Sequence, residues 1–123
     1  ITPDGATALV TCAGSSELVA YDVATRAVRA RVKVDVPLAP DAAERPFARL
    51  APGSALPVGL LVARDGHSAF VAATMGDRVV QYDVSTLAPS RIIEVGGEPD
   101  GLGSTAVLQA APCHACEAPT TPN

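Results

Sequence analysis

The sequence predicts an all-β fold made of two consecutive copies of a four-stranded antiparallel unit. Asp4-Gly5 recurs as Asp65-Gly66, and Tyr21-Asp22-Val23 recurs as Tyr82-Asp83-Val84, in both cases 61 residues further along the chain. Hydrophobic residues reach 48% and are mostly Ala, Val and Leu, which suits short strands. The 10 Gly and 11 Pro among 123 residues favour frequent turns over long helices.

The first copy, residues 1–35, contains three expected strands. Residues 6–12 form an apolar run directly after Asp4-Gly5, and Asp-Gly is the strongest short-range hairpin signal. Residues 16–22 alternate as a half-buried strand does, and residues 27–34 alternate between an apolar and a basic face. No strand precedes the first turn, so we expect this copy to lack its innermost strand and to be part of a longer chain.

The second copy, residues 57–98, contains all four expected strands. They cover residues 57–63, 67–73, 77–83 and 90–95. Tight turns join them in sequence order, which predicts an antiparallel meander. Residues 36–56 have no counterpart in the second copy and form an insert between the two units.

Several such units arranged around an axis would cover both faces of every sheet and leave only short outer edges. This argument favours a β-propeller fragment, with each copy forming one blade. A β-sandwich is the alternative, but two in-phase copies of four strands favour blades.

At these positions the sequence resembles the YVTN-type family of β-propellers, whose repeat is about 40 residues long. The resembling segments are Thr2-Pro3-Asp4-Gly5, residues 8–11, residues 18–25, and in the second copy residues 64–66, 69–72, 79–86 and 94–101. The chain departs from the family pattern at Cys12 and Thr74, where the family has Asn. The resemblance implies about seven blades in the whole ring, of which these are two near the C-terminus.

The residues after the second copy echo the start of a blade. Pro99-Asp100-Gly101-Leu102 is similar to Pro57-Val58-Gly59-Leu60, so residues 99–110 are expected to start a further inner strand or a closing segment. Residues 111–123 are rich in Ala, Pro and Thr and are expected to form a flexible tail.

The repeated acidic residues have a structural interpretation. Asp22 and Asp83 each precede Val-x-Thr, where a carboxylate accepts backbone N–H bonds of its own turn. Asp4-Gly5 and Asp65-Gly66 are expected hairpin turns. The sequence has no Gly-x-Ser-x-Gly nucleophile motif and no dinucleotide-binding loop, so we expect no catalytic residue in this chain.

The pair Cys113-His114-Ala115-Cys116 is the main candidate for a bound group. Covalent haem needs His directly after the second Cys, and Glu117 stands there, so we reject it. Structural zinc needs four ligands, and Cys113, His114 and Cys116 supply three. A zinc site completed by a partner, a redox pair and a mobile tail remain open, with the tail favoured and no cofactor expected. We expect Cys12 to be a small buried residue of its strand.

The insert is the segment with the strongest functional indication. Loops longer than about 12–15 residues are commonly functional or disordered, and in a propeller this connection lies at the mouth of the central channel. Asp41, Glu44, Arg45, Arg49 and, in the next connection, Asp100 are the candidate ligand-binding residues. We expect one helical turn capped by Asp41, a solvated pair of Glu44 with Arg45 or Arg49, and Phe47 holding the loop to the blade. A surface decoration without a ligand is the competing interpretation.

The charge and hydropathy of the sequence argue against nucleic-acid binding and against a membrane-spanning helix. The net charge is −4 with no Lys/Arg cluster, which argues against nucleic-acid binding. No apolar run approaches the roughly 18 residues that a membrane-spanning helix needs.

The leading hypothesis is a non-catalytic scaffold that binds a protein or small ligand on its channel-mouth face. Its partners include the remaining propeller blades, and self-association of this chain is a further possibility. The resemblance implies a secreted, periplasmic or cell-envelope protein. It also implies an alternative, a propeller enzyme similar to lactonases, amine dehydrogenases or haem-d nitrite reductases, with its active site built from other blades.

Overall fold

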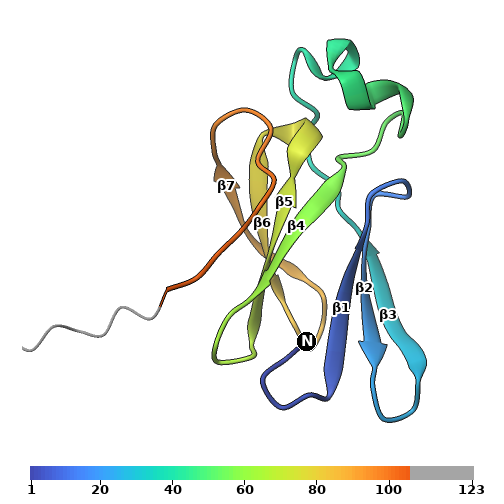
Figure 1. Ribbon diagram of the computed structural model, residues 1–123, viewed down its shortest axis with the longest axis vertical. Coiled ribbons are helices and arrows are strands. Elements are labelled where there is room, and N and C mark those ends of the chain that lie inside the picture. Colours follow the sequence, from blue (N-terminus) through green and yellow to red (C-terminus); the bar gives the residue numbers. More distant parts are fainter. Residues whose placement is uncertain (106–123) are drawn as a thin grey trace, which may run out of the picture.

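The computed structural model describes residues 1–105, which form two antiparallel sheets (Figure 1). The first sheet contains β1 (Thr7–Cys12), β2 (Glu17–Asp22) and β3 (Ala27–Lys33), in that order. The second contains β4 (Pro57–Val62), β5 (Ser68–Ala73), β6 (Arg78–Asp83) and β7 (Pro89–Glu94). The predicted all-β fold of two meanders, the first with three strands, is confirmed.

The 61-residue repeat extends to details of the backbone. Three pairs of equivalent residues share a positive φ: Gly5 (73°) with Gly66 (74°), Ser16 (55°) with Asp77 (52°), and Arg26 (57°) with Leu87 (57°). The strand register also shifts at equivalent places, between Ala20 and Tyr21 in the first sheet and between Gln81 and Tyr82 in the second. The two copies therefore have the same turns and the same bulge.

The core lies between the two sheets. Alternation along β1 turns Leu9 into this core, with 7% of its surface exposed, and leaves Val10 47% exposed on the opposite face. The buried apolar residues come from both sheets and include Leu9, Leu18, Ala20, Ala69, Val71, Ala73, Val80 and Tyr82. Burial raises the pKa of the Tyr82 phenol to about 12, because the charged form loses its hydration.

The insert contains two short 3-10 helices, η1 (Ala42–Glu44) and η2 (Pro46–Arg49). A small apolar cluster of Ala39, Ala42, Ala51, Leu56 and Met75 packs beneath them. The helical turn was predicted, but its cap was wrong: Asp41 makes no side-chain capping bond. Its carboxylate instead binds the Arg45 guanidinium, a charged donor that outcompetes a backbone N–H.

The connections gather at two ends of the sheets (Figure 1). We call the insert end the one that carries the insert, the β1–β2 turn, the β5–β6 turn with η3 (Thr74–Gly76), and the segment after β7. The chain's N-terminus and the other hairpin turns lie at the opposite end.

The expected further inner strand is not formed within residues 99–105, which have no strand partner. The rest of that segment, the tail, and Cys113, His114 and Cys116 lie outside the described residues. No helix between residues 1 and 105 is long and apolar enough to cross a membrane.

Candidate functional site

Arg45 attaches the insert to the β5–β6 turn. Its guanidinium donates to both carboxylate oxygens of Asp77, at 2.8 and 2.9 Å, and to the carbonyl oxygen of Thr74 at 3.0 Å. It also binds both carboxylate oxygens of Asp41, at 2.8 and 3.2 Å. Only 8% of the Arg45 side chain is exposed, so this predicted ligand-binding residue has its donors engaged within the protein.

Asp77 connects the insert to the segment after β7. It has a left-handed backbone conformation at the end of η3, and its Oδ1 accepts the backbone N–H of Glu98 at 2.9 Å. Bonds from Arg45 and Glu98 hold the pKa of the Asp77 carboxyl at about 2, because they stabilise its charged form. Sequence reasoning missed this residue. Its equivalent in the first copy is Ser16, whose hydroxyl oxygen accepts the backbone N–H of Ala55 in the insert at 3.1 Å and donates to the Val34 carbonyl oxygen just before the insert.

Glu44 and Arg49 lie on the outside of the insert and are exposed. The expected solvated pair of Glu44 with an arginine is not formed: among the described residues, the ion pairs of Arg45 go to Asp41 and Asp77. Arg49 borders a separate hollow of about 390 Å³, which is also lined by Ala42, Ala51 and Met75.

A hollow of about 380 Å³ opens beside the insert, which we call the insert-end hollow. It is lined by Phe47, Leu56, Val58, Thr74, Glu98 and Asp100, which come from the insert, β4, the β5–β6 turn and the segment after β7. Phe47, which is 48% exposed, borders the hollow together with Val58 of β4, which is 38% exposed. Of the predicted binding residues, only Asp100 lines this hollow.

Two backbone contacts position Asp100. The Thr74 hydroxyl donates to the carbonyl oxygen of Pro99 at 2.7 Å. The carbonyl oxygen of Asp100 lies so close to Gly59 on β4 that a Cβ at position 59 would be 1.8 Å from it. Glycine at this position of β4 therefore allows the segment after β7 to cross the start of the strand.

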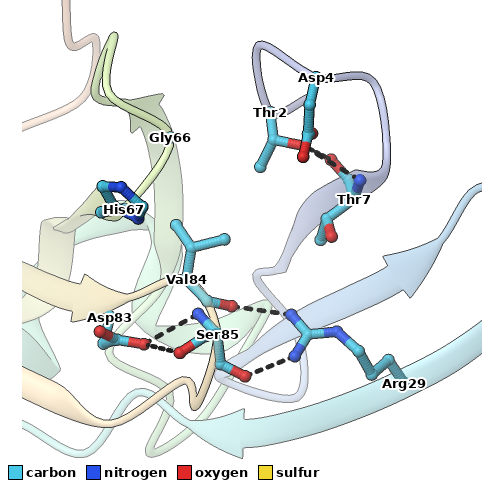
Figure 2. Close-up of a pocket in the computed structure, with 9 residues that line it drawn as sticks. All are labelled: Thr2, Asp4, Thr7, Arg29, Gly66, His67, Asp83, Val84 and Ser85. Carbon is cyan, nitrogen blue, oxygen red and sulfur yellow. Dashed lines mark hydrogen bonds between the residues drawn. The ribbon is translucent and has the colours of Figure 1, made fainter.

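A second hollow, of about 250 Å³, lies between the two sheets at the opposite end (Figure 2). Arg29 of β3 crosses it and donates to the carbonyl oxygens of Val84, at 2.7 Å, and of Ser85. His67, Asp83 and Ser85 all border this hollow, a set that suggests hydrolytic chemistry. The Asp83 carboxylate, however, binds the Ser85 backbone N–H and hydroxyl, and Figure 2 shows the His67 ring separate from both.

The repeated turn carboxylates bind their own turns. Asp22 accepts the Thr25 backbone N–H at 2.7 Å, and its pKa is lowered mainly by that bond. Asp83 accepts the backbone N–H of Ser85 and of Thr86, and the bonds from this turn hold its pKa at about 2. Asp4 and Asp65 each accept the N–H two residues on, at 3.0 and 2.9 Å. These carboxylates therefore stabilise the turns to which they belong.

Comparison with solved structures identifies the architecture. Over 82% of its length the chain is similar to Kuenenia stuttgartiensis hydrazine synthase, with a TM-score of 0.64 and 23% identity. It is also similar over 82% to the Cps50 (Swd1) β-propeller domain of Myceliophteria thermophila, with a TM-score of 0.60 and 15% identity. A third similar structure is apo AztD from Citrobacter koseri, with a TM-score of 0.59 and 20% identity over 82% of the chain.

The two sheets are β-propeller blades. At these identities the likeness establishes the fold alone. The chain corresponds to 23% of the hydrazine synthase chain, 26% of the Swd1 domain and 23% of AztD. No protein-family model and no curated protein matches the sequence. We refer below to the first blade (β1–β3) and the second blade (β4–β7).

Proposed function

We propose that the two blades belong to a non-catalytic β-propeller scaffold that binds a ligand at the insert end. The insert-end hollow supports this proposal. It is concave, largely apolar, and edged by a few polar groups, as ligand sites usually are. The attachment of the insert also supports the proposal. Because Arg45 already holds the insert in place, the insert loses little conformational freedom when a ligand binds.

The composition of the hollow favours a ligand that combines a positive charge with an apolar group. Glu98 and Asp100 are exposed acidic residues that line it, and the half-exposed Phe47 supplies an aromatic ring, which can attract a cation. Val58 and Leu56 supply apolar contact. A primary amine on a small hydrophobic body, or a lysine or arginine side chain of a protein, has this chemistry.

The proposed setting is the one that the resemblance to YVTN-type blades implies, a secreted or cell-envelope ring with further blades. The enzymatic alternative requires side chains from those other blades.

A titration of the isotope-labelled chain with benzylamine tests the proposal, with benzyl alcohol as the neutral probe of the same shape. We expect amide shifts at Val58, Glu98 and Asp100 with the amine and none of that size with the alcohol. The double change Glu98→Gln and Asp100→Asn should abolish them. Glu44→Gln, an exposed carboxylate of the insert outside the hollow, should leave them intact. Equal shifts with both probes, or none with either, would refute the proposal.

A further inference from the structure

The chain contains three Asp-Gly pairs, at residues 4–5, 65–66 and 100–101. Such a pair is chemically labile, because glycine has no Cβ to shield its backbone nitrogen from the neighbouring carboxyl group. The nitrogen can attack the carboxyl carbon and close a five-membered succinimide ring. All three aspartates are exposed, so exposure alone does not separate them. The hydrogen bonds around each pair do separate them.

Two of the pairs lie in hairpin turns that hold both reacting groups. The backbone N–H of Gly5 donates to the carbonyl oxygen of Thr2 at 2.8 Å, and that of Gly66 donates to the carbonyl oxygen of Ala63 at 2.9 Å. The carboxylates of the two turn aspartates accept the backbone N–H of the second residue on, at 3.0 and 2.9 Å. Ring closure in either turn must first break these bonds, which requires the turn to open locally.

The third pair, Asp100-Gly101, has neither restraint. The bonds that attach the segment after β7 to the β5–β6 turn end at Pro99. Among residues 1–105, no hydrogen bond engages the Gly101 N–H or the Asp100 carboxylate. A Cβ at Gly101 would meet nothing within 4 Å, so no neighbouring group crowds the glycine. Ring closure at this pair therefore needs no hydrogen bond of the described fold to break.

We propose that Asp100-Gly101 is a site of spontaneous isoaspartate formation, a covalent modification that remodels the edge of the insert-end hollow. The Gly101 nitrogen attacks the protonated side-chain carboxyl of Asp100, so that a C–N bond forms and a C–O bond breaks. The departing hydroxyl takes the amide proton and leaves as water. A second water then opens the ring at the former main-chain carbonyl carbon, which breaks the original peptide bond. One water is lost and one is gained, so the reaction is an isomerisation and needs no oxidant or reductant.

Isoaspartate at position 100 changes both carbonyl groups of this residue. The side-chain carboxyl of Asp100, which lines the hollow, becomes part of the main chain. The former main-chain carbonyl, whose oxygen packs on Gly59, becomes a free carboxylate. A carboxylate needs hydration or bonding partners, and the contact with β4 is so close that a Cβ at position 59 would be 1.8 Å from that oxygen. The segment after β7 therefore moves away from β4. On the proposed function, the hollow then loses affinity for its cation.

Ageing of the full chain in warm neutral buffer tests the proposal, with one sample folded and one in concentrated urea. Methylation by an isoaspartyl-specific carboxyl methyltransferase detects the product, and fragmentation mass spectrometry of peptides assigns it to a position. In the folded chain we expect isoaspartate to accumulate at position 100 at least tenfold faster than at positions 4 and 65. In urea the turns are lost, and the three rates should become similar because glycine follows every aspartate.

Gly101→Ala is the matched variant, because its methyl group shields the nitrogen and meets nothing within 4 Å. It should slow isoaspartate formation at position 100 at least tenfold in the folded chain. Gly97→Ala, in equally open surroundings, should leave the rate unchanged. In the aged unchanged chain, the native amide signals of Val58 and Thr74 should decline in step with the isoaspartate fraction. They should persist in aged Gly101→Ala, together with the shifts that benzylamine induces.

Equal rates at the three positions of the folded chain would overturn the proposal. So would a rate at position 100 that unfolding raises as much as it raises the rates in the two turns. Native signals of Val58 and Thr74 that survive in the isoaspartate form would refute the remodelling of the hollow. A fresh chain without benzylamine shifts would refute the ligand proposal alone, since isoaspartate and the native signals are measured without ligand.

Discussion

Arg45 and Asp77, 32 residues apart in the sequence, form a bidentate salt bridge, in which two guanidinium nitrogens each donate to one carboxylate oxygen. The contact links the middle of the insert to the β5–β6 turn of the second blade. Two parallel bonds fix direction as well as distance, which a lysine could not do. The insert is thereby a defined wall of the insert-end hollow.

Replacing Arg45 by alanine should detach the insert. The change leaves Asp77 and the Thr74 carbonyl oxygen without their main partner, and we expect the free energy of unfolding to fall by about 2 kcal/mol. Urea denaturation measures the loss, and proteolysis within residues 38–53 should accelerate. Arg49→Ala, an exposed arginine four residues on, is the matched control and should change stability by less than about 0.5 kcal/mol. Equal effects of the two changes would contradict the assigned role.

The sequence was sufficient for the blades because their signals are local. Asp-Gly turns, alternation and the Tyr-Asp-Val repeat each specify a strand or turn within a few residues, and Gly5 and Gly66 take the left-handed conformation that such turns need. The 61-residue spacing then fixed the correspondence of the strands. Boundaries differed from the structure by at most a residue or so, as at Thr7 and Lys33.

The site was predicted less well because it depends on contacts between distant segments. Charge alone gave no reason to pair Arg45 with Asp77 rather than with Glu44, its neighbour in the chain. The hollow needs η2, β4 and the segment after β7 in one place, and the decisive contact is Asp100 against Gly59. A glycine in a strand indicates a close backbone approach but does not name the partner.

Acid should weaken the attachment of the insert. The pKa of Asp77 is about 2 in the folded protein, below its ordinary value of 3.8. A carboxyl with a lowered folded-state pKa contributes stability that is present above pH 3.8 and is lost as the pH falls through about 2. Asp77→Asn should therefore be less stable than the unchanged chain at pH 6, and the difference should shrink below pH 3. Asp83 titrates in the same range, so the comparison of the two chains isolates Asp77. A difference that is constant from pH 6 to pH 2 would disprove the linkage.

Gly59→Ala should disturb the insert-end hollow. The new methyl group would lie 1.8 Å from the Asp100 carbonyl oxygen, so the crossing segment must move or the strand must shift. We expect a loss of about 1–3 kcal/mol in the free energy of unfolding, with amide shifts at Thr74 and Asp100. Gly97→Ala is the control, since a methyl group there meets nothing within 4 Å. Retention of the native shifts at Asp100 in Gly59→Ala would show that the contact is not formed in solution.

The pair Val10 and Val71 tests whether the two faces differ in energy as they do in exposure. Both are valines at the same place in equivalent strands, paired with Val19 and Val80 respectively. Val71 is 0% exposed, so Val71→Ala removes two buried methyl groups and leaves a cavity, which should cost about 2–3 kcal/mol. Val10 is 47% exposed, and Val10→Ala should cost less than about 1 kcal/mol in this chain. Denaturation of both variants measures the difference. Equal costs for the two changes would contradict the difference in burial between the two faces.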